Sequence, residues 1–434
     1  MRSLISHLRL TIRLLLKSPG FTIMAILIFG LGIGANTAIF SLVNGVLLKP
    51  LPYPHPERLV QIFQPFQNFD QVDLSYPDYV DFSANQHSFD SMTAFLPEDF
   101  NLSGRGEPER ISGLSVTANF FRMLGRPFLI GRPFGEAEEK PDAAAVVVIS
   151  EHLWRTRFHS DRSLIGEDLS LNGKRFQVVG VTPAEANEAA QVELYVPLGQ
   201  NPRFGTLLTT NRGNHNFVCV ARLKEGADLG SAQADLAVIR QNLAVRYPET
   251  DKAFGIRLVP YLDSAMTGYS LTLWLLEGAV ACLLLITCAN VANLLLARAR
   301  ERRREISIRS ALGASRLRLI IQLLFESTVL AVLGGIVGLL LSTWALTVIR
   351  SLAPPDIARF QEISLDAGTL LFVLAITLLT ALLSGLVPAL ANSEINLASA
   401  LKQEGDRSGT AGRERHRTQA FLVGGQVALT SVLL

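Results

Sequence analysis

Five long stretches with almost no charged side chains constrain the fold of this chain most strongly. A helix that crosses a bilayer needs about 20 consecutive apolar residues, whereas buried helices of soluble proteins need only about 10–14. The stretches are Ser18–Pro50, in which Lys49 is the only charge, Gly278–Ala297, Ser327–Ile349, Ala367–Ser393 and Thr418–Leu434. We therefore expect an α-helical integral membrane protein, in agreement with the low share of charged residues, 18%.

The first stretch has an alternative interpretation as the apolar part of a secretory signal peptide. Its basic end would consist of Arg2, Arg9, Arg13 and Lys17. The apolar part of a signal peptide is usually about 7–15 residues long, roughly half the length found here. A retained first membrane helix is therefore favoured.

The stretches divide the chain into a series of segments. We expect a cytoplasmic N-terminal segment (1–20), helix 1 (21–48), a periplasmic domain (49–268), helix 2 (269–297), a cytoplasmic coupling segment (298–323), helix 3 (324–350), helix 4 (367–393), a cytoplasmic linker (394–418) and the start of a truncated helix 5 (419–434). Residues 49–268, called the inserted domain below, are numerous enough to form a hydrophobic core of their own.

The distribution of basic residues predicts the orientation. Four bases precede the first helix, eight arginines lie within 298–318, and five bases follow the fourth helix. Basic residues close to membrane helices stay in the cytoplasm. If the helices alternate in direction, all three clusters fall on one side and the inserted domain, with 21 basic and 27 acidic residues, falls on the other. This predicts a multi-pass protein of a bacterial inner membrane, with a cytoplasmic N-terminus and a periplasmic inserted domain.

The inserted domain has the sequence pattern of an α+β fold. A continuous apolar run over 144–149 predicts a strand, and alternation over 169–181 around Asn172-Gly173 predicts a hairpin. Apolar residues at helical spacing predict a helix over 228–247 that ends before Pro248, and 254–262 is expected to return as a strand. The domain could consist of two subdomains.

No motif for catalysis or metal binding is visible in the inserted domain. Its histidines are scattered, and clustered ligands are typical of metal sites. Cys219 is the only cysteine there, which excludes an internal disulfide. The acidic run Asp70, Asp73, Asp78 and Asp81 is interpreted as a solvated face. We expect no catalytic residue, no metal and no cofactor. A membrane-anchored enzyme is the least favoured function class.

The membrane helices carry residues typical of helix packing. Gly30 and Gly34 are four residues apart, as are Gly334 and Gly338, and small residues at this spacing allow close approach of helices in lipid. Lipid-facing glycines are the alternative. Polar residues in such helices usually face other helices, so the remaining packing candidates are Asn290 and Asn293. Glu277 can reach the membrane interface and is not interpreted as a proton relay.

The segment between helices 2 and 3 combines basic, acidic and small apolar residues. Glu305 and Arg309 have the spacing of a helical ion pair, and Gly313 is typical of a helix end. Contact with anionic lipid would explain the arginines alone, whereas the glutamates and the compact turn favour docking of a protein. The candidate docking residues are Arg304, Glu305, Ile306, Ile308, Arg309, Ala311, Leu312, Gly313 and Ala314. The sequence contains no phosphate-binding loop, so any nucleotide would be hydrolysed on another polypeptide.

Six short motifs stand out along the chain: Lys17–Thr22, Gly32–Ser41, Leu47–Tyr53, Val116–Phe121, Asn290–Leu295 and Glu305–Ala314. Together they resemble motifs of MacB-like and FtsX-like ABC transporter permeases, in particular the N-terminal half of the large duplicated permeases of acidobacteria and related bacteria. The resemblance implies a periplasmic core domain followed by an FtsX-like helix unit. It also implies that a separate ABC ATPase, which binds the ATP, docks around Arg304–Ala314. In that family, motion driven by ATP passes through the helices to the periplasmic domain, a mechanism called mechanotransmission.

The resemblance leaves the biological role open between two classes. One is a permease subunit for export, efflux or release of an envelope substrate. The other is a non-transporting regulator or scaffold that activates a cell-wall hydrolase or senses an envelope signal. Expected partners are the ATPase, membrane lipid, a second permease half or a second copy, and a periplasmic protein, but no nucleic acid. Residues 419–434 resemble the first helix of a second half, so we expect a truncated or split product.

Overall fold

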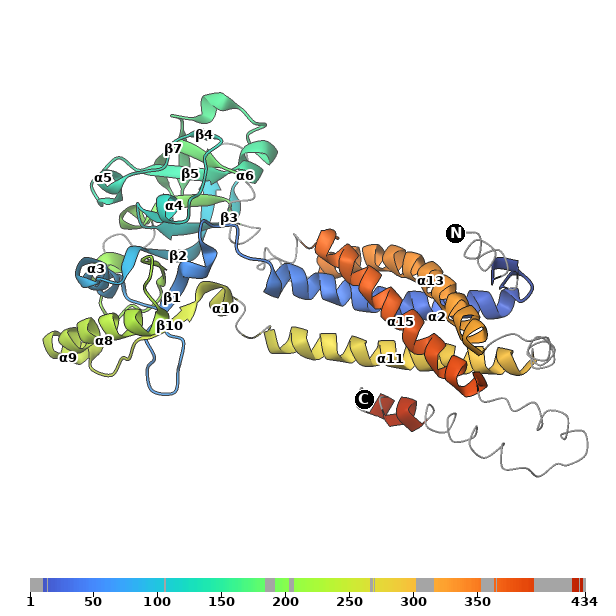
Figure 1. Ribbon diagram of the computed structural model, residues 1–434. Helices are drawn as coiled ribbons and strands as arrows, with labels where there is room; N and C mark the ends of the chain where they lie inside the picture. Colours follow the sequence, from blue (N-terminus) through green and yellow to red (C-terminus); the bar gives the residue numbers. More distant parts are fainter. Residues whose placement is uncertain are drawn as a thin grey trace, which may run out of the picture. The chain divides into compact units, whose positions relative to one another are not determined.

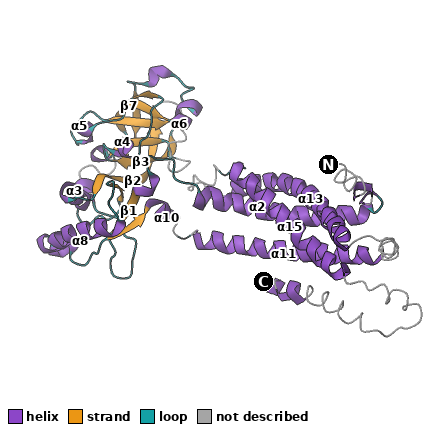
Figure 2. Cartoon of the chain, viewed as in Figure 1, coloured by secondary structure: helices purple, strands orange, loops and turns teal. Residues whose placement is uncertain are grey.

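The computed structural model describes most of the chain (Figure 1). The described residues are 11–13, 15–104, 107–183, 192–202, 207–265, 268, 270–301, 316–352, 363, 365–393, 424–428 and 430–431. Among them the chain separates into two compact units, one containing the long helices and the other containing Lys49–Thr267. Strands occur only in the second unit within the described residues (Figure 2).

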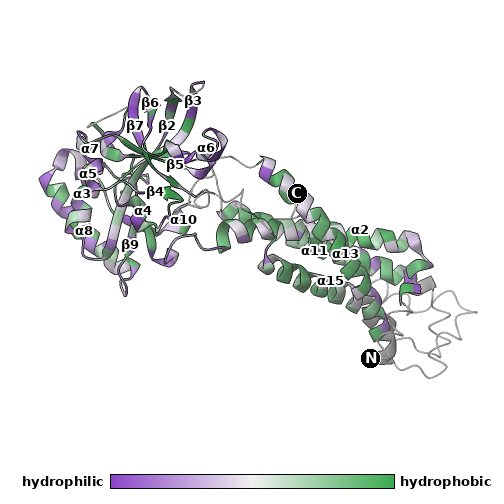
Figure 3. Ribbon diagram, turned by 90° about the horizontal axis from the view of Figure 1, so that it is seen from above, coloured by the Kyte–Doolittle hydropathy of each residue, from purple (hydrophilic) through white to green (hydrophobic). Residues whose placement is uncertain are grey.

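The first unit is a bundle of long apolar helices. Its members are α2 (Pro19–Val43), α11 (Ser270–Glu301), α13 (Arg316–Leu352) and α15 (Ala367–Ser393). In the part of the chain that the structure describes, four helices are long and apolar enough to cross a membrane, and each overlaps one of the first four predicted stretches. Hydrophobic residues cover them along most of their lengths, as Figure 3 shows.

Helix α2 packs against the three other long helices. It begins with Pro19, whose missing N–H costs nothing in the first helical turn. Buried side chains of all four helices form one apolar cluster, in which Phe29 and Ile33 of α2 are fully enclosed. At its end, α2 widens into a π-helical turn, Asn44–Leu48, immediately before the inserted domain. The first helix is therefore both the centre of the bundle and the chain's path into the second unit.

The inserted domain is built on a mixed sheet of ten strands, and the α+β prediction is confirmed. The strands are β1 (Leu59–Phe63), β2 (Phe89–Ser103), β3 (Glu109–Val116), β4 (Ile130–Gly131), β5 (Val146–Ser150), β6 (Asp168–Leu171), β7 (Lys174–Thr182), β8 (Leu194–Pro197), β9 (Val218–Leu223) and β10 (Arg257–Pro260). Their order is β10-β1-β9-β2-β3-β8-β5-β7-β4, with β6 beside β2 and β7. Pairing is antiparallel except between β3 and β8 and between β5 and β7.

Short helices cover the sheet and its ends. In chain order they are the turn η2 (Pro56–Arg58), α3 (Tyr76–Asn85), α4 (Phe120–Met123), α5 (Glu136–Glu139), α6 (Glu151–Thr156), η3 (Arg162–Leu164), η5 (Leu198–Gln200), α7 (Leu207–Thr210), α8 (Leu229–Arg246), α9 (Pro248–Asp251) and α10 (Tyr261–Ala265). Helix α8 begins where predicted, because the carboxylate of Asp228 accepts a hydrogen bond from the backbone of Ser231 at 2.9 Å.

The predicted hairpin is present as β6 and β7. Its turn residues Asn172 and Gly173 have φ angles of 48° and 82°. Positive φ at both positions is the geometry of a type I′ turn, which matches the twist of the flanking strands. The Asn-Gly pair therefore sets the register of this hairpin.

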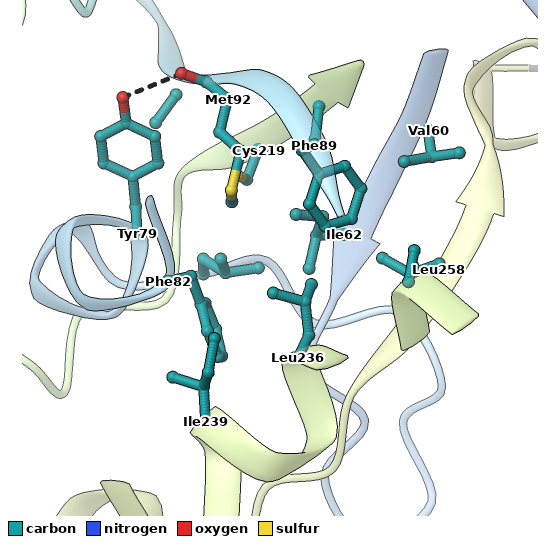
Figure 4. Packing of buried hydrophobic residues seen from close by; sticks show 14 of the residues in the cluster. Val60, Ile62, Tyr79, Phe82, Phe89, Met92, Cys219, Leu236, Ile239 and Leu258 are labelled. Atoms are coloured by element: carbon teal, nitrogen blue, oxygen red, sulfur yellow. Dashed lines mark hydrogen bonds between the residues drawn. The ribbon is translucent and has the colours of Figure 1, made fainter. Parts of the chain in front are cut away.

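In the described residues of the domain, one sheet is accompanied by three hydrophobic clusters. The fifteen-residue strand β2 pairs first with β9 and then with β3, and so extends from one half of the sheet into the other. One cluster lies between α3, α8 and the strands β1, β2 and β9 (Figure 4). There Tyr79 reaches the backbone of Met92, where its hydroxyl donates a hydrogen bond at 3.1 Å, and Cys219 lies fully buried. The two possible subdomains thus share one continuous sheet.

Candidate functional site

The four predicted packing glycines meet at the crossing of α2 and α13. A Cβ atom at Gly34 would lie 2.9 Å from the carbonyl oxygen of Gly338, and a Cβ at Gly338 would lie 3.0 Å from that of Gly30. A Cβ at Gly334 would collide with Phe29. Only glycine allows the two backbones to approach this closely, which maximises van der Waals contact in lipid.

Two further close approaches hold the other helices, and sequence reasoning did not identify their residues. Asn36, which is 1% exposed, donates a hydrogen bond from Nδ2 to the carbonyl oxygen of Val280 on α11 at 2.8 Å. Ser327 of α13 donates from its hydroxyl to Ala381 on α15 at 2.9 Å, at a place where Gly385 leaves room. A polar residue inside an apolar run is the signal that could have identified both.

A buried ion pair joins α11 to α13. Nη1 of Arg298 lies 2.6 Å from Oε1 of Glu326, and both side chains are less than 10% exposed. The guanidinium carbon of Arg298 lies 4.4 Å from the ring centroid of Phe21 on α2. Three helices therefore meet at one charged contact, at the end of α11 that leads into the predicted coupling segment.

A second polar contact holds the other end of α2. Nδ2 of Asn44 donates to the carboxylate of Asp366 at 3.1 Å. Asp366 also caps α15, because its carboxylate accepts the backbone N–H of Thr369 at 2.8 Å. The π-helical turn that leads into the inserted domain is thus tied to the start of α15.

The two predicted packing asparagines differ from each other. Oδ1 of Asn290 accepts a hydrogen bond from Gln426 at 3.1 Å. Oδ1 of Asn293 is buried and accepts no hydrogen bond from the described residues. The candidate docking residues Arg304 to Ala314 lie outside the described residues.

One interpretation of the inserted domain is wrong: the acidic run is not a solvated face. Asp78 is fully buried, and its carboxylate binds Arg240 of α8 at 3.0 Å and also Arg212. Arg212 pairs in addition with Asp81 at 2.6 Å. The arginines come from distant parts of the chain and neutralise the charge that the local sequence leaves unbalanced. Asp70, with 81% of its side chain exposed, is the member that does face solvent.

Two further side chains close to Asp78 and Arg240 have shifted pKa values. Burial, followed by the charge of Asp78, raises the pKa of Asp251, whose carboxylate lies 3.5 Å from Arg240. Burial lowers the pKa of His215, which is stacked on Phe254 with ring centroids 4.2 Å apart. His215 is partly buried, in contrast to the exposed His87. We call Asp78, Arg212, His215, Arg240 and Asp251 the charge cluster.

A cleft of about 470 Å³ lies beside α3 and α5. The hydroxyl of Tyr76 donates to Glu139 at 3.0 Å, and Glu139 also accepts the backbone N–H of Ala118 at 2.8 Å. Burial raises the pKa of both Tyr76 and Glu139. Within the described ranges, no three His, Cys, Asp or Glu side chains are arranged to hold a metal ion.

Comparison with known proteins identifies both parts of the chain. Residues 22–239 match the model of the MacB-like periplasmic core domain, and 278–397 match that of the FtsX-like permease C-terminal domain. Macrolide export ATP-binding/permease protein MacB of Campylobacter jejuni is 26% identical over 338 residues, which cover 76% of this chain and 48% of the relative. MacB of Bdellovibrio bacteriovorus is 27% identical over 316 residues, which cover 70% and 46%.

Solved structures also resemble this chain. The periplasmic region of MacB from Actinobacillus actinomycetemcomitans matches at 16% identity and a TM-score of 0.36, covering 50% of this chain and 92% of that one. The extracellular domain of the noncanonic ABC-type transporter YknZ matches at 15% identity and a TM-score of 0.34, covering 46% and 99%. The chain spans about half the length of the curated relatives it matches. Since the first family model alone covers half of the sequence, the chain belongs to the family that joins a MacB-like periplasmic core domain to an FtsX-like permease domain.

Proposed function

We propose that this chain is a non-catalytic permease subunit of a MacB/FtsX-type ABC transporter. It couples ATP hydrolysis on a separate ATPase to motion of the inserted domain, and that motion exports a substrate or releases one from the envelope. The names of the curated relatives pair an ATP-binding function with a permease. In this chain the permease and periplasmic parts are recognised, and a partner supplies the nucleotide site.

The position of the arginine-rich segment carries this proposal. Helices α2 and α11 flank the inserted domain in sequence, and α11 is long enough to cross the membrane once. The segment that follows α11 therefore lies on the opposite side from the inserted domain. Eight arginines between 298 and 318 favour the cytoplasm for that side, where ATP is available. We accordingly place the N-terminus in the cytoplasm and the inserted domain in the periplasm, with the helices in the inner membrane.

The bundle supports transmission of a force from one side to the other. Glycine contacts, the Asn36 hydrogen bond and the Asn44–Asp366 contact connect α2 to its neighbours along its length. A helix held in this way moves as a rigid element. Its π-helical end continues directly into the inserted domain, so a displacement of the bundle reaches that domain through the chain itself.

A docking experiment tests the proposal. The full chain is co-expressed with candidate ATPase subunits and purified in detergent, and the amount of co-purified ATPase is measured. Replacing Glu305, Arg309 and Leu312 together by alanine should reduce this amount at least about tenfold, which corresponds to roughly 1.4 kcal/mol. The matched control replaces the exposed pair Asp99 and Arg110 of the inserted domain by alanine and should leave binding unchanged.

Undiminished binding of the ATPase to the triple variant would contradict docking at this segment. Labelling with a membrane-impermeant maleimide tests the topology separately, with single cysteines introduced at Arg110 and Arg304 after replacement of the native ones. Reaction of both positions in intact cells would place them on the same side and exclude the transmission model. Crosslinking of a cell-wall hydrolase to the inserted domain would favour the regulatory role instead.

A further inference from the structure

The ion pair between Arg298 and Glu326 is an unusual feature of the helical bundle. Arg298 is the last residue of the candidate membrane span Ser270–Arg298, and Glu326 lies within the span Ile320–Leu352. Their side chains are 7% and 5% exposed, and the charged atoms are 2.6 Å apart. Ionisable side chains are expensive inside a membrane, and when present they usually mark a functional element.

Stability alone does not account for such a pair. Replacing a buried ion pair by well-packed apolar residues is often neutral or stabilising, because the loss of hydration offsets the attraction between the charges. An ion pair does differ from an apolar contact, because each buried charge depends on its oppositely charged partner. This pair therefore suits a contact that must keep its register while helices move.

The pair lies next to the segment proposed to receive the ATPase. Arg298 is in the last turn of α11 before residues 302–315, and Glu326 is in the first third of α13, the helix that follows them. One charge thus comes from each of the helices that enclose the segment. Displacement of the segment by a docked protein would act on both helices at this contact.

The pair also reaches the first helix. The guanidinium of Arg298 stacks on Phe21, the third residue of α2. Leu15 and Leu295 belong to the apolar cluster of the bundle. Cation–π contacts are stronger in a desolvated position than at an exposed one. The contact therefore joins α11, α13 and α2 at the end of the bundle nearest to the docking segment.

We propose that Arg298 and Glu326 are the positioning residues that transmit displacement of the docking segment to helix α2, with Phe21 as the receiving side chain. This inference rests on the proposed function and adds the place at which the force enters the bundle. The role of the pair is to keep the helices around the segment and the first helix moving as one body.

The test measures coupling separately from binding. The full chain is purified with its ATPase, all native cysteines are replaced by alanine, and a reporter cysteine is placed at Leu48, which ends the π-helical turn and is 51% exposed. The maleimide labelling rate at this position is compared between the nucleotide-free complex and the complex trapped with ATP and vanadate. We expect the wild-type rates to differ about fivefold or more, the lower end of typical coupling between sites.

Arg298→Gln and Glu326→Gln should each bring this rate ratio close to one while the amount of bound ATPase stays at the wild-type level. The exchange R298E with E326R restores an opposite pair and should recover at least half of the response. Glu277→Gln is the matched control, since it neutralises a half-buried carboxylate of α11 that is not part of the ion pair, and it should retain the full response.

Several results would overturn the inference. One is a normal response in both single variants, and another is failure of the exchange to recover the response at a normal level of bound ATPase. If the exchanged variant does not fold, Glu326→Gln against Glu277→Gln decides, because equal responses in these two contradict the inference. A wild-type chain that binds no ATPase, or binds it without any nucleotide-dependent change, contradicts the proposed function itself.

Discussion

The carboxylate of Asp78 lies 3.0 Å from Nη2 of Arg240, and both side chains are enclosed by the inserted domain. Gln64 donates a further hydrogen bond to the same carboxylate at 2.9 Å. The contact connects α3 with α8, two helices that also meet in the hydrophobic cluster containing Phe82 and Leu236. A charge that is buried among apolar residues is tolerated only with such partners.

Removing the negative charge of Asp78 should destabilise the inserted domain. In Asp78→Asn, the buried Arg240 and the partly buried Arg212 each lose a charged partner, and breaking a buried pair in this way costs about 3–5 kcal/mol. Cys219 serves as the intrinsic reporter of unfolding, because it is fully buried in the hydrophobic cluster that contains Phe82 and Leu236. With Cys282 and Cys288 replaced by alanine, the urea dependence of maleimide labelling at Cys219 gives the free energy of unfolding.

Asp70→Asn is the control for this experiment. Asp70 belongs to the same acidic run, but 81% of its side chain is exposed and it lies 3.6 Å from Arg257. Exposed ion pairs contribute at most about 1 kcal/mol. Equal losses of stability in the two variants would contradict the assignment of Asp78 as the buried anchor.

The stability of the inserted domain should decrease on acidification through the titration range of His215. Burial holds the folded-state pKa of His215 below its ordinary value of 6.5, so the unfolded chain binds more protons between these two pKa values. The contribution of His215 is therefore complete above pH 6.5 and is lost as the pH falls toward the folded-state pKa. Asp78 favours the protonated form and Arg240 opposes it.

His215→Gln should reduce this pH dependence. Labelling of Cys219 in urea, repeated at several pH values, would measure the slope of the unfolding free energy against pH. His87→Gln, at a side chain that is 86% exposed, should leave the slope as it is in the wild type. A slope that is the same in the wild type and in His215→Gln would show that His215 is not the titrating group.

Gly338→Ala should destabilise the helix bundle. The added methyl group would lie 2.9 Å from the backbone nitrogen of Gly34, and backbone atoms cannot turn aside as a flexible side chain can. Overpacking of this kind costs about 1–3 kcal/mol. With Cys288 as the single remaining cysteine, its labelling during titration with sodium dodecyl sulphate reports opening of the bundle. Gly278→Ala, where the new methyl group would have no neighbour within 4 Å, should cause no loss.

Asn36→Ala should loosen the contact between α2 and α11. It removes the hydrogen bond to Val280, and such bonds between membrane helices are worth about 0.6–1.7 kcal/mol. The same Cys288 assay would detect this loss. Thr343→Ala is the comparison, since the hydroxyl of Thr343 is exposed and bonds only within its own helix in the described part of the chain. A larger effect of Thr343→Ala would contradict the role given to Asn36.

Local sequence patterns predicted the elements whose cause is itself local. The hairpin at Asn172-Gly173 and the start of α8 at Asp228 depend on a turn geometry and a cap, and both involve residues at most three positions apart. The long apolar helices were also predictable, because length and hydropathy are properties of a continuous stretch. The π-helical turn after α2 was not predicted, and its contact Asn44–Asp366 joins residues 322 positions apart.

The residues of the charge cluster show why the remainder was missed. Asp78 occurs in the sequence like any member of an exposed acidic run, and its partners Arg212 and Arg240 are 134 and 162 positions away. In the same way, Arg298 appears as one of several arginines, and only its contacts with Glu326 and Phe21 distinguish it.

The sequence by itself determined that this chain has membrane-spanning helices with a large α+β domain inserted between the first two, because apolar length, turn residues and helix caps act over short distances. Only the tertiary structure decided which of its many charges are buried and which glycines face each other. Burial and the pairing of charges are set by residues that become neighbours after folding, and no local pattern in the chain records those neighbours.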